Sequence, residues 1–169
     1  MYGLLGEKLG HSFSKEIHES INDYKYNLIE VSKEDFSCFM TNRNFKAINV
    51  KTLVFPGFAT DLGQPMSVLL TQADGMSIFE ETIYENRMGH IKYLQKMGAN
   101  IRVNDRTAII VGKTPLKGEE VTATDLRAGA AMVIAGLIAK GTTTVNEIDH
   151  ILRGYENIVV KLSNVGANI

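Results

Sequence analysis

The chain has 169 residues, 44% of them hydrophobic, and its 18 basic and 19 acidic residues give a formal net charge of −1. These values are typical of one globular domain or two small ones, and without a basic run they argue against nucleic acid as a partner. The single cysteine, Cys38, rules out an internal disulfide and favours a reducing, cytoplasmic location. The most apolar stretch, Ala128–Ala139, is far shorter than the roughly 20 residues that cross a bilayer, so no membrane contact is expected.

The first fifty residues alternate between predicted strands and helices. Tyr2–Leu5 is a short apolar run before Gly6, and Ser14 is a suitable N-cap for a helix. Tyr26–Val31 predicts a second strand, Ser32 caps a second helix, and Phe45–Val50 predicts a third strand. This β-α-β-α-β order favours a parallel sheet.

From Lys51 onward the pattern changes, without a low-complexity linker between the two parts. Thr52–Phe55 predicts a strand before Pro56-Gly57, and Asp61–Thr71 predicts a helix. We expect Leu62, Met66, Leu69 and Leu70 on the buried face of that helix. The later elements are predicted as strand Ser77–Ile83, helix Ile91–Met97 ended by Gly98, a hairpin of Ile101–Val103 with Ala108–Val111, helix Leu126–Ala139 ended by Gly141, strand Thr143–Ile148 and helix Tyr155–Val165.

This second part repeats itself. Its equivalent positions lie 64 to 68 residues apart, and a period of this kind marks a duplicated structural unit. The chain ends before the second copy is finished, so we interpret it as a piece of something larger, with units at about 51–113 and 119–169 and the second truncated. The matching residues are Thr60-Asp61-Leu62 with Thr124-Asp125-Leu126, Gly75 with Gly141, Arg87 with Arg153, and Gly98–Ile101 with Gly166–Ile169.

Asp61 and Asp125 are the first candidate site residues, because each follows a threonine and opens a predicted helix. In the simpler interpretation Thr60 and Thr124 cap the helices, and each carboxylate complements the helix dipole, which contributes about 0.3–1 kcal/mol. In the alternative one aspartate accepts a proton from a substrate hydroxyl. A free aspartate has a pKa near ~3.9, so this role requires a position within hydrogen-bond reach of the hydroxyl.

Arg87, Arg127 and Arg153 form a second candidate group. Arg127 lies in the first turn of its predicted helix, where a cation opposes the dipole, which argues for a specific role. Guanidinium groups bind carboxylate and phosphate through paired hydrogen bonds. The alternative is surface ion pairing with Glu85 or Glu156, worth roughly 0–1 kcal/mol.

Residues 51–169 resemble the UDP-N-acetylglucosamine 1-carboxyvinyltransferase family. The motifs that carry the resemblance are Pro56-Gly57-Phe58-Ala59-Thr60-Asp61-Leu62, Glu85-Asn86-Arg87, Ala123–Ala130 and Arg153-Gly154-Tyr155-Glu156. The resemblance implies an α/β (α+β) fold of β-α-β-β-α-β units arranged as an inside-out barrel. It also implies transfer of the enolpyruvyl group of phosphoenolpyruvate to the 3′-hydroxyl of UDP-N-acetylglucosamine in peptidoglycan precursor synthesis, without a cofactor or a metal.

The same resemblance assigns roles to single residues. Asp61 would be the carboxylate positioned on the sugar hydroxyl, and the backbone of Ile83 would contact the UDP-sugar. Arg127 and Arg153 would contact phosphoenolpyruvate with support from Asp125. The remaining family position, Arg87, would help to close the domain interface.

The family's N-terminal half does not appear in this sequence. With it are missing a Lys-Asn pair that holds phosphoenolpyruvate and the loop that carries the general acid. Cys38 does not replace that acid, because it lies in the unrelated first segment and is expected to be a buried thiol. We therefore expect the chain to be inactive alone.

Residues 1–50 resemble the N-terminus of shikimate dehydrogenase, through Gly6–His18 and Phe45–Val50. The resemblance implies that Ser12 and Ser14 hold a shikimate carboxylate and that Asn49 holds a ring hydroxyl. The family's catalytic lysine is missing, and so is a G-x-G-x-x-G site for NADP. This alternative enzyme is therefore incomplete as well.

A third hypothesis is a non-catalytic module in which Arg127 and Arg153 hold an anion weakly. All three hypotheses share one expectation about the helix that contains Val133, Ile134, Leu137 and Ile138. If part of its apolar surface is uncovered, the chain self-associates or aggregates.

Overall fold

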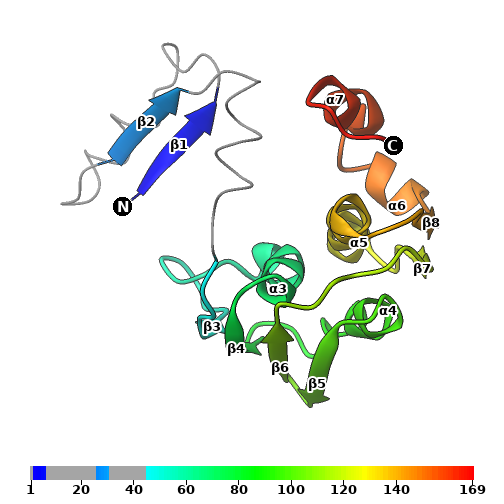
Figure 1. The fold of residues 1–169 in the computed structure, drawn as a ribbon. Coiled ribbons are helices and arrows are strands. Elements are labelled where there is room, and N and C mark those ends of the chain that lie inside the picture. Colours follow the sequence, from blue (N-terminus) through cyan, green and yellow to red (C-terminus); the bar gives the residue numbers. More distant parts are fainter. Residues whose placement is uncertain (1, 7–25, 31–44) are drawn as a thin grey trace. The chain divides into compact units, whose positions relative to one another are not determined.

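The computed structural model describes residues 2–6, 26–30 and 45–169 (Figure 1). The chain divides into two compact units, Met1–Arg43 and Asn44–Ile169. In the first unit, β1 (Tyr2–Gly6) and β2 (Tyr26–Glu30) pair in parallel, with Tyr2 opposite Tyr26. This confirms the predicted parallel pairing. The helices expected after Ser14 and Ser32 lie outside the described residues.

The third predicted strand does not join this parallel pair. Residues 45–51 belong to the second unit, where β3 (Val50–Lys51) pairs in parallel with β4 (Gly75–Glu80). Lys46 forms a bridge with Asp74, and its ammonium lies 2.7 Å from the Asp74 carboxylate. The prediction that this segment completes the first sheet was therefore wrong, because its main-chain partners lie around Asp74 and along β4.

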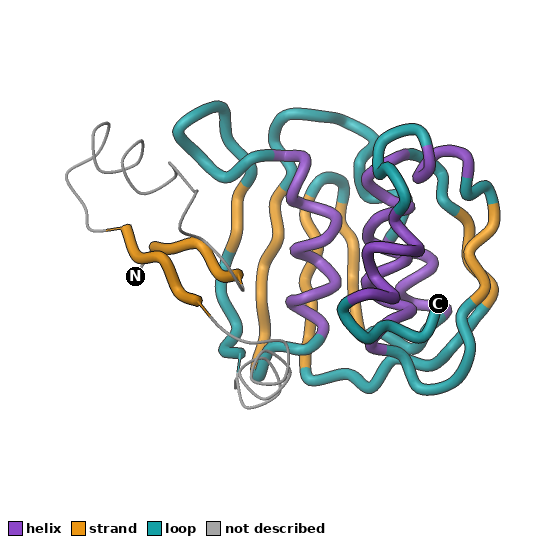
Figure 2. Tube along the Cα trace, turned by 90° about the horizontal axis from the view of Figure 1, so that it is seen from above, coloured by secondary structure: helices purple, strands orange, loops and turns teal. Residues whose placement is uncertain are grey.

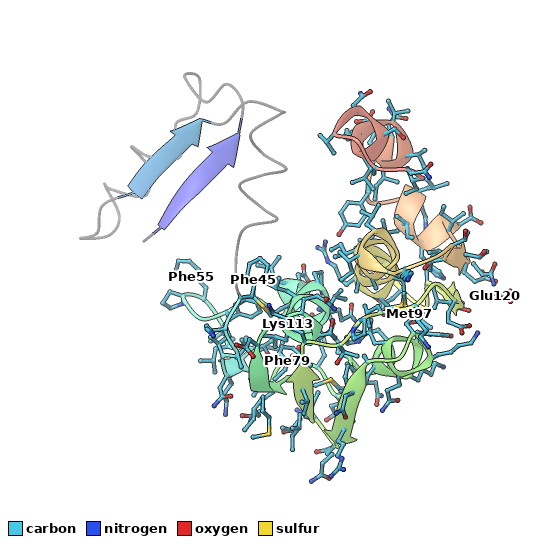
Figure 3. All side chains as sticks on the ribbon, in the orientation of Figure 1. Phe45, Phe55, Phe79, Met97, Lys113 and Glu120 are labelled. Atoms are coloured by element: carbon cyan, nitrogen blue, oxygen red, sulfur yellow. The ribbon has the colours of Figure 1, made fainter. Side chains whose placement is uncertain are left out.

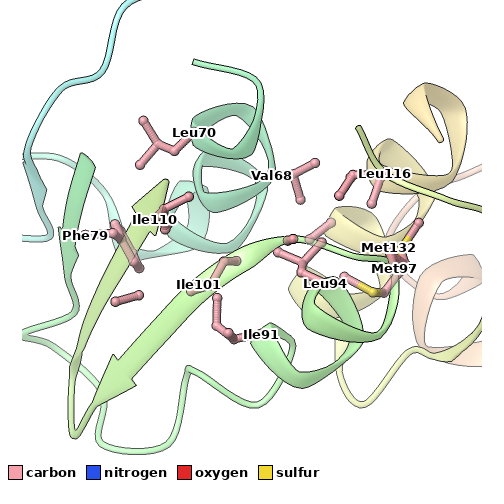
Figure 4. Packing of buried hydrophobic residues seen from close by; sticks show 14 of the residues in the cluster. Val68, Leu70, Phe79, Ile91, Leu94, Met97, Ile101, Ile110, Leu116 and Met132 are labelled. Atoms are coloured by element: carbon pink, nitrogen blue, oxygen red, sulfur yellow. The ribbon is translucent and has the colours of Figure 1, made fainter. Parts of the chain in front are cut away.

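The second unit contains a four-stranded mixed sheet of order β3-β4-β6-β5, with β5 (Asn100–Asn104) and β6 (Thr107–Gly112) joined as the predicted hairpin. Figure 2 shows these strands running side by side. Two helices, α3 (Gly63–Thr71) and α4 (Ile91–Lys96), pack on one face of this sheet. Figure 4 shows the buried side chains of this layer. The opposite face carries exposed apolar side chains, namely Met76, Ile78, Ile109 and Val111.

The second copy of the repeat builds the same crossover. Strands β7 (Glu120–Thr122) and β8 (Thr144–Asn146) pair in parallel and are joined through α5 (Leu126–Ile138), as β3 and β4 are joined through α3. Two short helices follow, α6 (Asp149–Leu152) and α7 (Ile158–Asn164). The repeat-equivalent glycines share a left-handed backbone: φ is +114° at Gly75 and +99° at Gly141, and +99° at Gly98 and +95° at Gly166. Glycine adopts this conformation without steric cost, which explains why the repeat keeps it there.

The segment before α3 differs from its prediction. Thr52 forms an isolated bridge with Phe58, and the Gly57 N–H bonds to the Val54 carbonyl, so residues 52–58 form a loop and not a strand. Figure 3 shows Phe55 on this loop, whereas Phe79 points into the layer between sheet and helices.

The predicted buried face of α3 is only partly right. Leu70 is buried and Met66 packs against the core, but Leu62 and Leu69 are 55% and 39% exposed. The helix begins at Gly63, and polar Ser67 lies buried on its inner face because the Ser67 hydroxyl bonds to a helix carbonyl.

Helix α5 has one covered and one open side. Its small residues pack against the core, and Ala128, Ala131 and Ala135 are fully buried. Ile134 and Ile138 on the other side are 39% and 46% exposed, as expected for a helix that is partly uncovered. In the part of the chain that the structure describes, no helix combines the length and apolarity needed to cross a membrane.

Candidate functional site

A carboxylate held by two guanidinium groups lies where the two repeat units meet. Asp61 belongs to the 3-10 turn η1 (Thr60–Leu62) that precedes α3, and Arg127 to the first turn of α5. Arg127 Nη2 lies 2.7 Å from Asp61 Oδ2, and Arg87 Nη1 lies 3.1 Å from Asp61 Oδ1. The structure therefore brings together three residues that are far apart in sequence.

This arrangement keeps Asp61 ionised. Hydrogen bonds from Arg127 first and from Arg87 second lower the pKa of Asp61 below its ordinary value, although partial burial opposes them. The Asp61 side chain remains 49% exposed. The group can therefore accept a hydrogen bond from an incoming hydroxyl, but its low basicity makes it an orienting group first and a proton acceptor second.

Arg127 is fixed from two sides. Its Nη1 donates to the Tyr155 hydroxyl at 3.1 Å while its Nη2 contacts Asp61. The bonds to Tyr155 and Asp61 raise the pKa of Arg127 above its ordinary value. The negative charge of Asp61 also offsets the unfavourable position of this cation at a helix N-terminus. The alternative pairing predicted for these arginines is not seen, because Glu85 pairs with Arg106 and Glu156 with Lys161.

Asp125 has a different position from its repeat equivalent. Asp125 Oδ1 accepts hydrogen bonds from the main-chain N–H groups of Arg127 and Ala128, both at 2.8 Å, so Asp125 is the N-cap of α5. The prediction that Thr124 and Thr60 serve as caps was wrong. Ala59 occupies the N-cap position of η1 without a side-chain bond, and the Thr60 hydroxyl points to Glu81.

Arg153 lies next to this cluster but is not joined to it. Its Nη2 lies 2.8 Å from His150 Nδ1, and its Nε donates to the Asp149 carbonyl at 3.3 Å. It lines a surface hollow together with Thr124 and Asp125. Among the described residues, no hydrogen bond or ion pair links Arg153 to Asp61.

Ile83 and Arg87 line a second, open hollow, which also includes Tyr84, Glu85 and Asn86. The Ile83 N–H is occupied within the chain, because it donates to Glu81 Oε1 at 2.8 Å. Tyr84 supports the guanidinium of Arg87, whose Cζ lies 4.5 Å from the centre of the Tyr84 ring.

Glu81 is the residue of this region that sequence reasoning missed. It is 2% exposed, yet its carboxylate accepts hydrogen bonds from Thr52, Thr60 and the main chain after β4. Burial alone would raise the pKa of Glu81, but these donors together lower it. The sequence shows only a charged residue directly after β4, which does not reveal that its carboxylate is buried or which donors it meets.

Only one of the three predicted shikimate-binding residues lies in the part of the chain that the structure describes. Ser12 and Ser14 lie outside the described residues. Asn49 lies beside the sheet, where its Oδ1 accepts a hydrogen bond from the Ile78 N–H at 3.0 Å. Within the described ranges, no three histidine, cysteine, aspartate or glutamate side chains gather as metal ligands.

Known proteins resemble the chain along most of its length. The family model described as EPSP synthase (3-phosphoshikimate 1-carboxyvinyltransferase) matches residues 9–162. The match thus includes most of the first fifty residues, which were compared above with shikimate dehydrogenase.

Two curated relatives are both named UDP-N-acetylglucosamine 1-carboxyvinyltransferase 2. The protein of Geobacillus kaustophilus is 54% identical over 124 residues, which cover 73% of this chain and 29% of the relative. The protein of Bacillus subtilis is 49% identical over 141 residues, or 83% and 33% of the two chains. The chain therefore spans about a third or less of the length of these relatives.

A solved structure shares the fold. The crystal structure of the enolpyruvyl transferase NikO from Streptomyces tendae aligns with a TM-score of 0.70 and 28% sequence identity, and the alignment covers 75% of this chain and 29% of that one.

Proposed function

Because the chain belongs to the EPSP synthase family of enolpyruvyl transferases, we propose that it carries one wall of a site for UDP-N-acetylglucosamine and phosphoenolpyruvate. The whole protein would transfer the enolpyruvyl group to the sugar 3′-hydroxyl and release phosphate. The curated relatives that are named for this reaction support the choice of sugar nucleotide over a shikimate phosphate.

The observation that carries the proposal is the ion pair between Asp61 and Arg127. Asp61 is ionised, half exposed and held by two cations that come from separate segments of the chain. A sugar hydroxyl can approach the exposed carboxylate and donate to it. The phosphate and carboxylate groups of phosphoenolpyruvate are the anions that guanidinium groups bind best, so they would compete with Asp61 for Arg127.

The other predicted site residues would support Asp61 and Arg127 or add contacts to the substrates. Asp125 fixes the first turn of α5 and so the direction of Arg127. Arg153 would add a second positive charge from the neighbouring hollow, and Arg87 would hold the far side of Asp61. Ile83 would contact the sugar nucleotide through its main-chain carbonyl, since its N–H is already bonded to Glu81.

We further propose that this chain binds substrate weakly and does not turn it over alone. The general acid and the Lys-Asn pair expected of the family do not appear in its sequence. The dehydrogenase alternative gains no support, because the family match begins at residue 9. The anion-binding alternative remains as the case in which Arg127 and Arg153 hold an anion such as phosphate without sugar specificity.

Isothermal titration calorimetry with UDP-N-acetylglucosamine tests the proposal. We expect weak binding that Asp61→Asn abolishes and that Asp105→Asn leaves unchanged. Asp105 is the matched control because it is an exposed aspartate in the β5–β6 turn, with a φ of +53° that asparagine adopts well. Equal binding of inorganic phosphate and UDP-N-acetylglucosamine would favour the anion-binding alternative. Phosphate release by this chain alone, above the Asp61→Asn background, would contradict inactivity.

A further inference from the structure

We propose that Glu81 is a positioning residue of this site, which sets the Arg87 guanidinium on Asp61 from two directions. Glu81 does not touch the proposed substrate position. Its side chain is 2% exposed, and its four hydrogen-bond donors come from three segments: the loop after β3, the turn η1, and the main chain after β4.

The first route runs through the Thr60 hydroxyl. Thr60 Oγ1 donates to Glu81 Oε2 at 2.7 Å and accepts from Arg87 Nη1 at 3.2 Å. A hydroxyl has one proton to donate. Because an ionised Glu81 can only accept, the Thr60 proton points to Glu81, and its lone pairs face Arg87.

The second route runs through the main chain. Glu81 Oε1 accepts from the N–H groups of Ile83 and Tyr84 at 2.8 and 3.2 Å, which fixes the turn after β4. That turn carries the Tyr84 ring against the Arg87 guanidinium, 4.5 Å from its Cζ to the ring centre. Glu81 therefore fixes both the hydroxyl and the ring that Arg87 contacts.

The result is a series of hydrogen-bonded groups that ends on the candidate site and in which carboxylates and guanidinium groups alternate, with one neutral hydroxyl after the first carboxylate. The groups are Glu81, the Thr60 hydroxyl, Arg87, Asp61 and Arg127. Near the buried end, no cation pairs with Glu81 within the part of the chain that the structure describes. Its charge is instead satisfied by neutral donors, a situation in which a carboxylate stays ionised when it accepts several hydrogen bonds.

Glu81→Gln tests this arrangement with a minimal change of shape. The amide oxygen of glutamine can face Thr52, Ile83 and Tyr84, as Oε1 does now. Its NH2 group must then face Thr60, which forces the Thr60 hydroxyl to accept there. Both lone pairs of the hydroxyl are then taken by N–H donors, and its proton no longer has the Glu81 carboxylate as acceptor. The Thr60–Arg87 bond loses the negative charge that polarises it, so the support of the guanidinium weakens.

Three threonine variants separate this effect from general loosening. Thr60→Val removes the hydroxyl between Glu81 and Arg87, and Thr60→Ser restores it. Thr52→Val is the matched control, because the Thr52 hydroxyl also donates to Glu81, at 2.9 Å, but does not contact Arg87. A merely structural role for Glu81 would give Thr52→Val and Thr60→Val the same consequences.

The primary readout is the pKa of Asp61, measured by 13C NMR of its carboxyl carbon during a pH titration of each variant. We expect Glu81→Gln and Thr60→Val to raise the Asp61 pKa toward that of a free aspartate, and Thr60→Ser and Thr52→Val to leave it at the wild-type value. The double variant Glu81→Gln/Thr60→Val should show no further rise of the Asp61 pKa, since both changes break the same route through the Thr60 hydroxyl. An unchanged Asp61 pKa in Glu81→Gln, or an equal rise in Thr52→Val, would overturn the inference.

A second readout, affinity for UDP-N-acetylglucosamine, rests on the proposed function. We expect Glu81→Gln and Thr60→Val to weaken binding by about tenfold, the equivalent of ~1.4 kcal/mol. If the wild-type chain binds no sugar nucleotide while the pKa pattern holds, the proposed function fails and the role of Glu81 stands. If binding occurs but the pKa pattern is absent, the proposed function stands and the role of Glu81 is refuted.

Discussion

Asp61 and Asp125 occupy equivalent positions in the two repeat units, yet their carboxylates have different partners. Asp125 binds two main-chain N–H groups of its own helix, whereas Asp61 binds the side chains of Arg87 and Arg127. Duplication thus supplied two carboxylates at helix starts. One of them stabilises α5, and the other is left half exposed beside two cations, where a substrate can reach it.

The capping role predicts a stability effect at Asp125. Asp125→Ala leaves two N–H groups of α5 without partners and should lower the free energy of unfolding by about 1 kcal/mol. Asp125→Ser, which can still cap, should recover most of this loss. Urea unfolding at neutral pH measures both. Equal stability of Asp125→Ala and the wild type would contradict the role.

Buried His90 predicts a pH dependence between pH 5 and 7. Its Nε2 lies 2.7 Å from Ser67 Oγ and its Nδ1 3.1 Å from the Arg87 carbonyl. Burial lowers the pKa of His90 to about 4, although the Arg87 carbonyl and the charge of Asp125 oppose the shift. The unfolded chain, with a histidine pKa near ~6.5, therefore takes up a proton that the folded chain refuses.

The free energy of unfolding should accordingly fall as pH drops from about 6.5 toward 4, by roughly 3 kcal/mol in total, and this residue should contribute no slope above pH 7. His90→Gln should flatten the curve between pH 5 and 7. Asp61 and Glu81 titrate below that window, because their pKa values are lowered from already acidic ones. Urea titrations at a series of pH values give the slope, and an unchanged slope in His90→Gln would refute the assignment.

Close packing of α5 against α6 predicts a size limit at Gly129. A Cβ at this position would lie 2.5 Å from Ile151 Cγ1 and 3.0 Å from Ala123 Cβ. Gly129→Ala should therefore cost about 1–3 kcal/mol of stability. Gly89→Ala is the control, because a Cβ there meets no atom within 4 Å. Thermal unfolding of the two variants should separate them clearly, and matching melting temperatures would contradict the packing.

The open side of α5 predicts self-association of the chain through a second copy. Leu137 and Ile138 are 41% and 46% exposed next to Ile134, and exposed apolar surface of this kind favours association. Leu137→Lys should shift the protein toward monomer in sedimentation velocity experiments. Ile109→Lys, on the outer sheet face at 37% exposure, should not. A wild-type chain that remains monomeric at all concentrations would contradict this prediction.

Local sequence signals predicted much of the second unit. The repeat, its glycines and the order of helices and strands after residue 61 follow from spacing and turn chemistry, and the β5–β6 hairpin agrees with the prediction. The same signals failed where contacts between residues far apart in sequence determine the structure. The segment 45–51 joined another sheet, and Leu69 faces solvent although its apolar character suited the core.

The candidate site likewise contains residues that the sequence could single out and a residue that it could not. Asp61 and Arg127 could be singled out as unusual residues at helix starts, but their contact spans 66 residues and depends on how the repeat units pack. Glu81 was not predictable, because its importance comes from donors that lie 21 and 29 residues away and from main-chain groups that any residue supplies.

The most direct test of the account is a 1H–15N NMR titration of the chain with UDP-N-acetylglucosamine, followed at the amides of Ile83 and Arg87 and at the side chain of Arg127. The account predicts saturable shifts that are concentrated at these groups and absent in Asp61→Asn. Shifts confined to the β5–β6 hairpin, or shifts that persist unchanged in Asp61→Asn, would contradict a sugar-nucleotide site built around this carboxylate.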